Sequence, residues 1–280
     1  MPVPAPAPSS RPARVARAAL RHMRRATFAA ALGAGALGTG VAGAPRAAHA
    51  QSAADHVTMG DRDRYTNPAS ALGHYEAALQ QDPKNYLALA RGSEMAVDIG
   101  EGADASKRAQ LYAKGEQYAR RAIEAKPADA EGHFALARAL GRRAQTLGSR
   151  DRVKFAGEVR SHALEALKYE PQHAGALHIM GMWNAEVMRL SGVSRFMAKN
   201  FLGGKVFDSA NWDDAQRYLE QAVTAEPNRL IHRIDLAEVL LDRGDKTRAR
   251  TQIEAIRKAP ATEANDARYK RKAEELARRL

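Results

Sequence analysis

The chain has 280 residues, no cysteine and a formal net charge of +12. Without cysteine there can be no disulfides, thiolate metal sites or lipid-modified N-terminal cysteine. Seven Arg and no acidic residue lie in residues 1–50, which leaves 37 basic and 32 acidic residues for 51–280. A charge of +5 spread over that length does not make the basic stripe of a nucleic-acid-binding protein, so we expect no nucleic-acid partner.

Residues 1–50 have the pattern of a signal peptide with an extended N-terminus. Arg24 and Arg25 precede an Ala- and Gly-rich apolar run over 26–43, and a small-x-small motif ends at Ala50. Charged region, apolar region and cleavage motif occur in the order of a secretory signal. We therefore expect cleavage between Ala50 and Gln51 and an exported protein, either periplasmic or secreted. The alternative is a membrane anchor, because the uncleaved run is about the shortest that spans a bilayer.

A repeat that ends on proline governs the rest of the chain. Five residues before each of four prolines stands an alanine followed by Leu, Ile or Val, and a fifth unit ends at Pro260. A small residue lets two helices approach closely, and proline ends a helix because it lacks a backbone donor. The alanines are Ala78, Ala122, Ala166 and Ala222, and their prolines are Pro83, Pro127, Pro171 and Pro227.

An apolar helical pattern follows each of these prolines, so the unit is helix, proline turn, helix. Repetition of such a unit is typical of an α-solenoid, and tetratricopeptide units have a period of about 34 residues. Here the prolines are 44, 44, 56 and 33 residues apart. The 44-residue intervals predict longer helices, and the 56-residue interval predicts an insertion at 191–211.

The pattern predicts an all-α fold, an α-solenoid of tetratricopeptide-like antiparallel helix pairs over 67–280. Residues 51–66 are predicted to form a flexible lead-in. Helices are predicted over 68–81, 85–98, 104–125, 128–146, 151–169, 172–190, 194–202, 211–225, 228–243, 246–258 and 263–279.

Three segments carry a family resemblance: AEGHFALARALG (130–141), HALEALKYEPQHAGALHIMGMWNAEV (162–187) and DDAQRYLEQAVTAEP (213–227). Through them the chain from about Asn67 to Leu280 resembles the regulator of microtubule dynamics family of tetratricopeptide-like proteins. The resemblance implies a scaffold or interaction protein with no catalytic residues to transfer. The chain departs from the family pattern within 191–211. An exported protein would not meet cytoplasmic microtubules, so we expect no microtubule partner.

The predicted register places a set of side chains on the concave face of the solenoid. Their mix of aromatic, cationic and thioether groups suits an acidic peptide end or an anionic amphiphile. The set consists of Phe134, Arg138, His178, Met182, Arg233 and Glu238. In the insertion, Phe196, Phe201 and Lys205 are predicted to make a contact, either as an extra helix packed on the solenoid or as a lid or weak membrane-surface contact.

The histidines do not have the spacing of a metal site, and no nucleophile–base or paired-carboxylate arrangement stands out. We therefore expect no metal, no cofactor and no enzymatic activity. The prediction is a non-catalytic scaffold that binds a protein or peptide partner in its concave groove. The alternative is a binder or carrier of an amphipathic small molecule such as a lipid. A large continuous apolar cavity would favour the small molecule, and an open charged groove would favour the protein partner.

Overall fold

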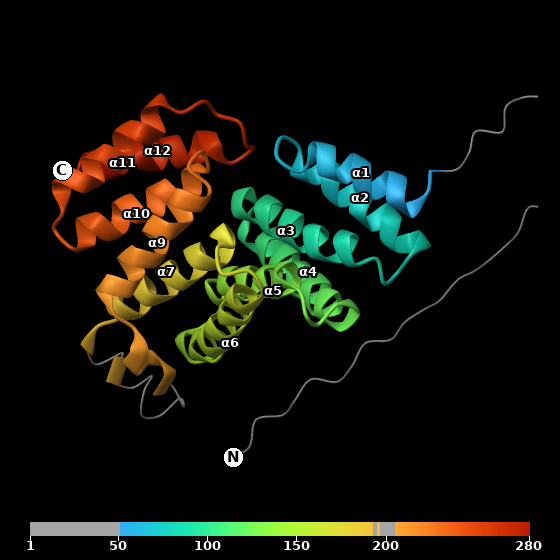
Figure 1. Ribbon diagram of the computed structural model, residues 1–280, viewed down its shortest axis with the longest axis horizontal. Coiled ribbons are helices and arrows are strands. Elements are labelled where there is room, and N and C mark those ends of the chain that lie inside the picture. Colours follow the sequence, from blue (N-terminus) through green and yellow to red (C-terminus); the bar gives the residue numbers. More distant parts are fainter. Residues whose placement is uncertain (1–50, 193–194, 197–204) are drawn as a thin grey trace, which may run out of the picture. The chain divides into compact units, whose positions relative to one another are not determined.

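The computed structural model describes residues 51–192, 195–196 and 205–280, and all regular structure in these residues is helical (Figure 1). The predicted signal peptide at 1–50 lies outside the described residues. The helices are α1 (Ala53–Asp63), α2 (Pro68–Gln81), α3 (Tyr86–Gly102), α4 (Ala105–Ala125), α5 (Ala130–Ala144), α6 (Ser149–Tyr169), α7 (Ala174–Arg189), the 3-10 helix η1 (Lys205–Ser209), α9 (Trp212–Ala225), α10 (Leu230–Asp242), α11 (Lys246–Lys258) and α12 (Asp266–Ala277).

The predicted helix, proline turn, helix unit is confirmed. α2, α4, α6 and α9 each end two residues before the repeat proline, with one C-cap residue between. Most of the following starts are fixed by a side-chain cap; for example, the Asn85 side chain accepts a hydrogen bond from the Ala88 amide. The four repeat alanines are fully buried, as close helix approach requires. α4 and α6 have 21 residues each, which accounts for part of the 44-residue spacing.

Successive helices pack in antiparallel pairs, and the first helices of neighbouring pairs also contact one another. α3 contacts α5, α5 contacts α7, α7 contacts α10, and α10 contacts α12. These first helices form the inner layer of the superhelix, whereas α4, α6, α9 and α11 lie outside it (Figure 1). Polar residues on the inner layer therefore face the concave side of the solenoid.

The superhelix curves until its C-terminal helix reaches its N-terminal half. Glu101, near the end of α3, has a buried carboxylate whose Oε2 accepts a 3.2 Å hydrogen bond from the Tyr269 hydroxyl of α12. The same oxygen lies 3.1 Å from Arg268 Nη1, and Arg142 Nη2 on α5 lies 2.7 Å from Oε1. The backbone adds a 2.8 Å hydrogen bond from the Ala264 amide to the Tyr65 carbonyl. These contacts close one side of the concave face.

The prediction of a flexible lead-in at 51–66 is wrong, because residues 53–63 form α1. Ser52 and Asp55 form a capping box at its start. Gly60 gives the close approach to α2, since a Cβ at this position would lie 2.5 Å from the Tyr75 ring. The sequence pattern did not indicate this helix because its buried face consists of only Val57 and Gly60 and not of a stripe of large apolar residues.

The insertion is described only in part. Most of the helix predicted at 194–202 lies outside the described residues, and 205–209 form η1. Phe207 is buried, with its ring centroid 6.1 Å from that of Trp183. None of the described helices has the length and apolar content needed to cross a membrane.

Replacing Glu101 with Gln should destabilise the fold by about 3 kcal/mol, because it leaves Arg142 and Arg268 without their buried counter-charge. Urea unfolding at pH 7 measures this loss. Glu274→Gln is the matched control. It breaks an exposed ion pair between Glu274 on α12 and Arg257 on α11, and it should leave the unfolding midpoint unchanged. Equal effects of the two variants would contradict the role assigned to Glu101.

Candidate functional site

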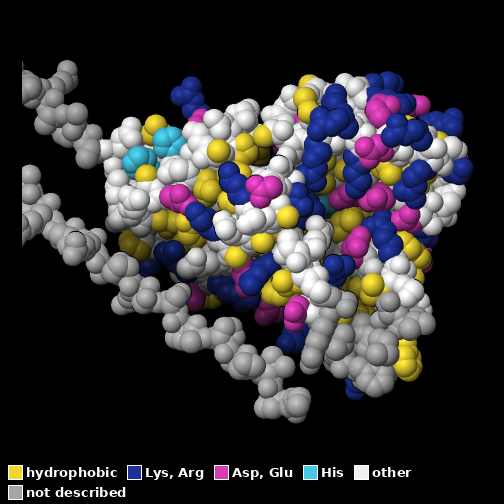
Figure 2. Space-filling view, turned by 180° about the vertical axis from the view of Figure 1, so that it is seen from behind, with side chains coloured by type: hydrophobic (Ala, Val, Ile, Leu, Met, Phe, Trp, Pro, Cys, Tyr) yellow, Lys and Arg dark blue, Asp and Glu magenta, His cyan; other side chains and the backbone are white. Residues whose placement is uncertain are grey.

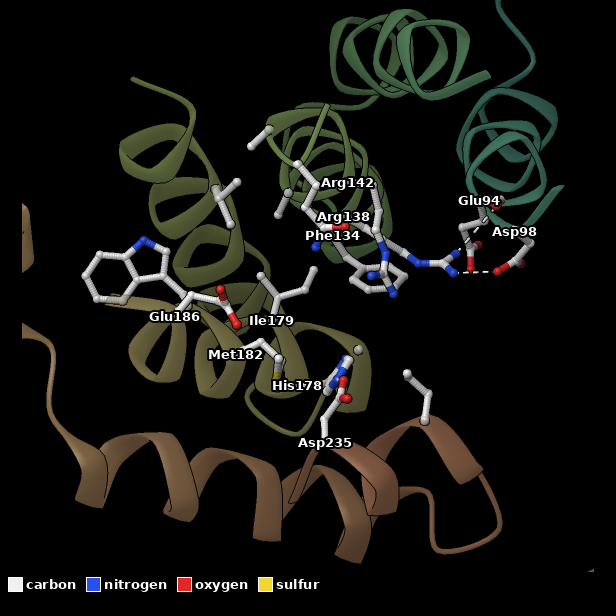
Figure 3. Close-up of a pocket in the computed structure, with 18 of the residues that line it drawn as sticks. Glu94, Asp98, Phe134, Arg138, Arg142, His178, Ile179, Met182, Glu186 and Asp235 are labelled. Carbon is white, nitrogen blue, oxygen red and sulfur yellow. Dashed lines mark hydrogen bonds and ion pairs between the residues drawn. The ribbon is translucent and has the colours of Figure 1, made fainter. Parts of the chain in front are cut away.

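The concave side of the solenoid contains a cavity of about 690 Å³. Its walls come from the inner helices α3, α5, α7, α10 and α12, from α6, and from the loops after α1 and α11. Figure 3 shows side chains from α3, α5, α7 and α10 converging on this space. The cavity has two chemically different ends.

One end of the cavity is an apolar wall formed by α6, α7 and η1. Val153 and Val159 come from α6, and Ile179, Met182 and Trp183 come from α7. The Trp183 indole is held in place because its Nε1 donates a 2.8 Å hydrogen bond to the Ala156 carbonyl. Such a surface favours the aliphatic or aromatic part of a ligand, since burial of apolar area drives binding.

The other end is charged, and its side chains are largely paired with one another. Arg138 Nη2 lies 2.5 Å from Asp98 Oδ1, joining α5 to α3 (Figure 3). His178 Nε2 on α7 lies 2.8 Å from Asp235 Oδ2 on α10, and Lys272 lies 3.3 Å from the other oxygen. Although burial opposes it, the contacts with His178 and Lys272 hold the pKa of Asp235 well below its usual range.

A pair of carboxyl groups lies beside these ion pairs. Glu94 on α3 is 2% exposed, and burial, with the like charge of Glu131, raises its pKa to about 7. Arg64, Arg138 and Arg229 oppose this rise but do not cancel it. Although burial opposes it, hydrogen bonds from His173 and Glu94 lower the pKa of Glu131. The two carboxyls titrate as a pair, in which burial and the like charge of Glu131 favour the protonated form of Glu94.

Four of the six predicted groove residues line this cavity. Phe134, Arg138, His178 and Met182 all lie on its surface, and Phe134 and His173 have ring centroids 4.6 Å apart.

Arg233 and Glu238 do not join this group. The Arg233 side chain donates to the Pro227 carbonyl and to Gln252, and Glu238 pairs with Arg189 and Lys272. On α10 the cavity is lined by His232 and Asp235 instead.

Of the predicted insertion contacts, the two that the structure describes do not line the cavity. Phe196 is 58% exposed, Lys205 is exposed at the start of η1, and Phe201 lies outside the described residues. Ala50, on one side of the predicted cleavage site, is also outside them, whereas Gln51 accepts a hydrogen bond from Gln81 through its carbonyl.

Sequence reasoning missed Glu94, His232 and Asp235. Each is a polar residue within an apolar stretch of the first helix of a pair. A polar residue that interrupts such a stretch could have indicated a cavity-lining position. Among the described residues no cluster of His, Asp and Glu has the arrangement of a metal site.

The raised pKa of Glu94 should make stability depend on pH. The unfolded carboxyl ionises near 4.5 and the folded one near 7, so its contribution is fully present below pH 4.5 and is lost as pH rises through 7. Glu94→Gln should remove about 3 kcal/mol of this pH dependence between pH 4.5 and 8. Urea unfolding of both proteins across this range measures it, and identical pH profiles would contradict the assignment.

Comparison with known proteins gives the family. The model of the regulator of microtubule dynamics protein 1-3 family matches residues 51–280. Regulator of microtubule dynamics protein 1 of Mus musculus is 24% identical over 140 residues, which cover 50% of this chain and 45% of the mouse protein. The Bos taurus protein is 23% identical over 148 residues, covering 53% of this chain and 46% of that protein. The chain thus spans about half the length of these curated relatives.

Among solved structures, a thermophilic TPR protein of Thermus thermophilus superposes with a TM-score of 0.58 at 18% sequence identity. The superposition covers 81% of this chain and 99% of that chain, and it supports the tetratricopeptide-like solenoid. Because the family model matches residues 51–280, the chain belongs to the regulator of microtubule dynamics family.

Proposed function

We propose that this helical-repeat scaffold is a non-catalytic binding protein that holds an amphipathic molecule in its central cavity. The observation that carries the proposal is the cavity of about 690 Å³ with an apolar wall at one end and charged groups at the other. Sites for small molecules commonly have volumes of 300–1,000 Å³, mostly apolar walls and a few placed polar groups. The geometry therefore favours the small-molecule alternative over an open, charged groove for a protein partner.

The pairing of the charged groups supports binding over catalysis. Arg138, His178 and Asp235 each have a polar partner on a neighbouring helix within 3 Å, so these contacts hold helices together around the cavity. A catalytic acid or base has to face its substrate with a proton to give or take. In this cavity the paired groups instead supply a fixed polar surface.

Export of the protein is part of the same proposal. The charged, apolar and cleavage segments of residues 1–50 support it. The family match also begins at residue 51, the residue after the proposed cleavage site. The proposed ligand would then be met outside the cytoplasm, and we do not extend to this chain the microtubule role that its relatives are named for.

Figure 2 shows the face of the molecule behind the view of Figure 1. Basic and acidic side chains alternate there, especially over the half formed by the C-terminal helices. A surface of mixed sign does not offer the continuous positive track that a phosphate backbone requires. This distribution supports a ligand held inside the solenoid over a polyanion bound across that face.

Filling the cavity should abolish binding. A Cβ at Gly141, which lines the cavity on α5, would meet only Val159 at 3.9 Å, so Gly141→Leu places a side chain in the cavity without a backbone clash. Gly157→Leu on α6 is the matched control, because its Cβ meets nothing within 4 Å and it does not line the cavity. Both variants should be at least as stable as the wild type, since glycine is a poor helix former.

The probe is the amphipathic dye 1-anilinonaphthalene-8-sulfonate, titrated into the full chain and followed by fluorescence. We expect binding to the wild type and to Gly157→Leu, with at least a tenfold loss of affinity in Gly141→Leu. Equal binding by all three proteins would place the dye outside the cavity and refute the proposal, as would no binding to the wild type.

A further inference from the structure

Four buried polar atoms of cavity-lining side chains have no hydrogen-bond partner in the part of the chain that the structure describes. Two of them are acceptors, Glu94 Oε1 and His232 Nδ1, and two are donors, Arg64 Nε and Arg229 Nε, the latter in a long ion pair at 3.5 Å from Glu263 Oε1. Buried polar groups in folded proteins are almost always satisfied, so each exception calls for an explanation. A ligand that carries both donors and acceptors would satisfy them together.

The role of His232 as an acceptor follows from its surroundings. The side chain is 2% exposed, and its Nε2 lies 3.1 Å from Glu226 Oε2. Burial lowers the pKa of His232 to about 4, so the ring is neutral at pH 7. Because Nε2 then donates to Glu226, Nδ1 carries the lone pair. The cavity therefore has two unpartnered acceptors, Glu94 Oε1 on α3 and His232 Nδ1 on α10.

Glu94 is the group that most needs a positive partner. Its carboxyl is buried, and Arg64 Nη2 lies 3.7 Å from its Oε2, too far for a hydrogen bond. The carboxyl of Glu131 lies close enough to repel the ionised form. In Figure 3, Glu94 projects from α3 toward the side of the cavity that Arg138 occupies. His173, whose Nε2 lies 3.0 Å from Glu131 Oε2, and the three arginines reduce this repulsion, but the pKa of Glu94 stays raised, so a further cation beside Glu94 is favoured.

We infer that this end of the cavity binds a zwitterionic head group, with its ammonium on Glu94 and its adjacent anionic group on Arg64 and Arg229. The inference rests on the proposed function, because it places the apolar part of the same molecule on the wall that contains Ile179, Met182 and Trp183. The head group needs both charges close together, since Arg64 Nη2 lies 3.7 Å from Glu94 Oε2.

Binding of the ammonium exchanges one cation for another. The proton of Glu94 leaves to solvent and the ammonium takes its place, so one positive charge still compensates the two carboxyls, while the anionic group of the ligand is met by Arg64 and Arg229. The groups that face Glu94 are Glu131, which favours the proton, and Arg64, Arg138, Arg229 and protonated His173, which oppose it. Affinity for the ammonium should therefore fall as pH drops below 7, because protons then compete for the same carboxyl.

Three probes with one chain length separate the contributions of the head group. They are 2-aminododecanoic acid, dodecylamine and dodecanoic acid, each titrated calorimetrically into the full chain at pH 8, below the concentration at which the probe aggregates. The zwitterion should bind most tightly. Glu94→Gln should weaken binding of the zwitterion and of the amine at least tenfold and should leave binding of dodecanoic acid unchanged. Unchanged binding of the amine to Glu94→Gln would overturn the inference.

Glu131→Gln is the matched control, because Glu131 touches Glu94 but does not line the cavity. Glu131→Gln removes the like charge that raises the pKa of Glu94. The pH below which zwitterion binding is lost should therefore fall, while binding at pH 8 should remain. A merely structural carboxyl pair would not shift this pH profile. Titrations at pH 7 in buffers of different ionisation enthalpy should also show proton release on binding to the wild type and none to Glu94→Gln.

The outcomes distinguish this inference from the proposed function. If the dye and dodecanoic acid bind the wild type but not Gly141→Leu, the cavity is a binding site. In that case, zwitterion binding that is insensitive to Glu94→Gln refutes only the head-group assignment. If none of the probes binds the wild type, the proposed function fails as well.

Discussion

The buried carboxylate of Glu101 joins the two halves of the superhelix. Burying a lone carboxylate is costly, and Glu101 is tolerated because Arg142, Arg268 and the Tyr269 hydroxyl surround it. Although burial opposes it, the charges of Arg142, Arg138 and Arg268 and the hydrogen bond from Tyr269 keep the pKa of Glu101 below its usual range. In most α-solenoids each repeat contacts only its neighbours. Here an interaction across more than 160 residues of sequence turns an open groove into a cavity closed on one side.

The closure and the binding site share two charged residues, Arg138 and Asp235. Arg138 lies between Asp98, at 2.5 Å, and Glu101, at 4.0 Å, so one guanidinium faces the cavity and also supports the carboxylate at its closure. Asp235 likewise connects His178 in the cavity to Lys272 of α12. A ligand that alters the charge balance at this end should therefore change how firmly α12 is held. Binding and closure are expected to be coupled through electrostatics, without a change in the helices themselves.

Much of the fold could be predicted from the sequence, because proline turns and buried alanines are local signals. The closure could not, since it depends on Glu101 and Tyr269, which are distant in sequence and have no shared periodicity. The candidate site was predicted in part: Phe134, Arg138, His178 and Met182 line the cavity. Arg233 and Glu238 do not, because α10 presents His232 and Asp235 to the cavity, and a count from the proline does not fix the rotation of a helix to within one residue.

Binding and closure meet in one feature, a solenoid that closes on itself around a ligand cavity. A crystal structure of the full chain grown with 2-aminododecanoic acid would show both at once. We expect Glu101 in contact with Arg268 and Tyr269, with the head group of the probe beside Glu94 and its chain along Ile179 and Met182. A structure in which α12 is turned away from α3, or in which the probe lies on the outer helices, would contradict it.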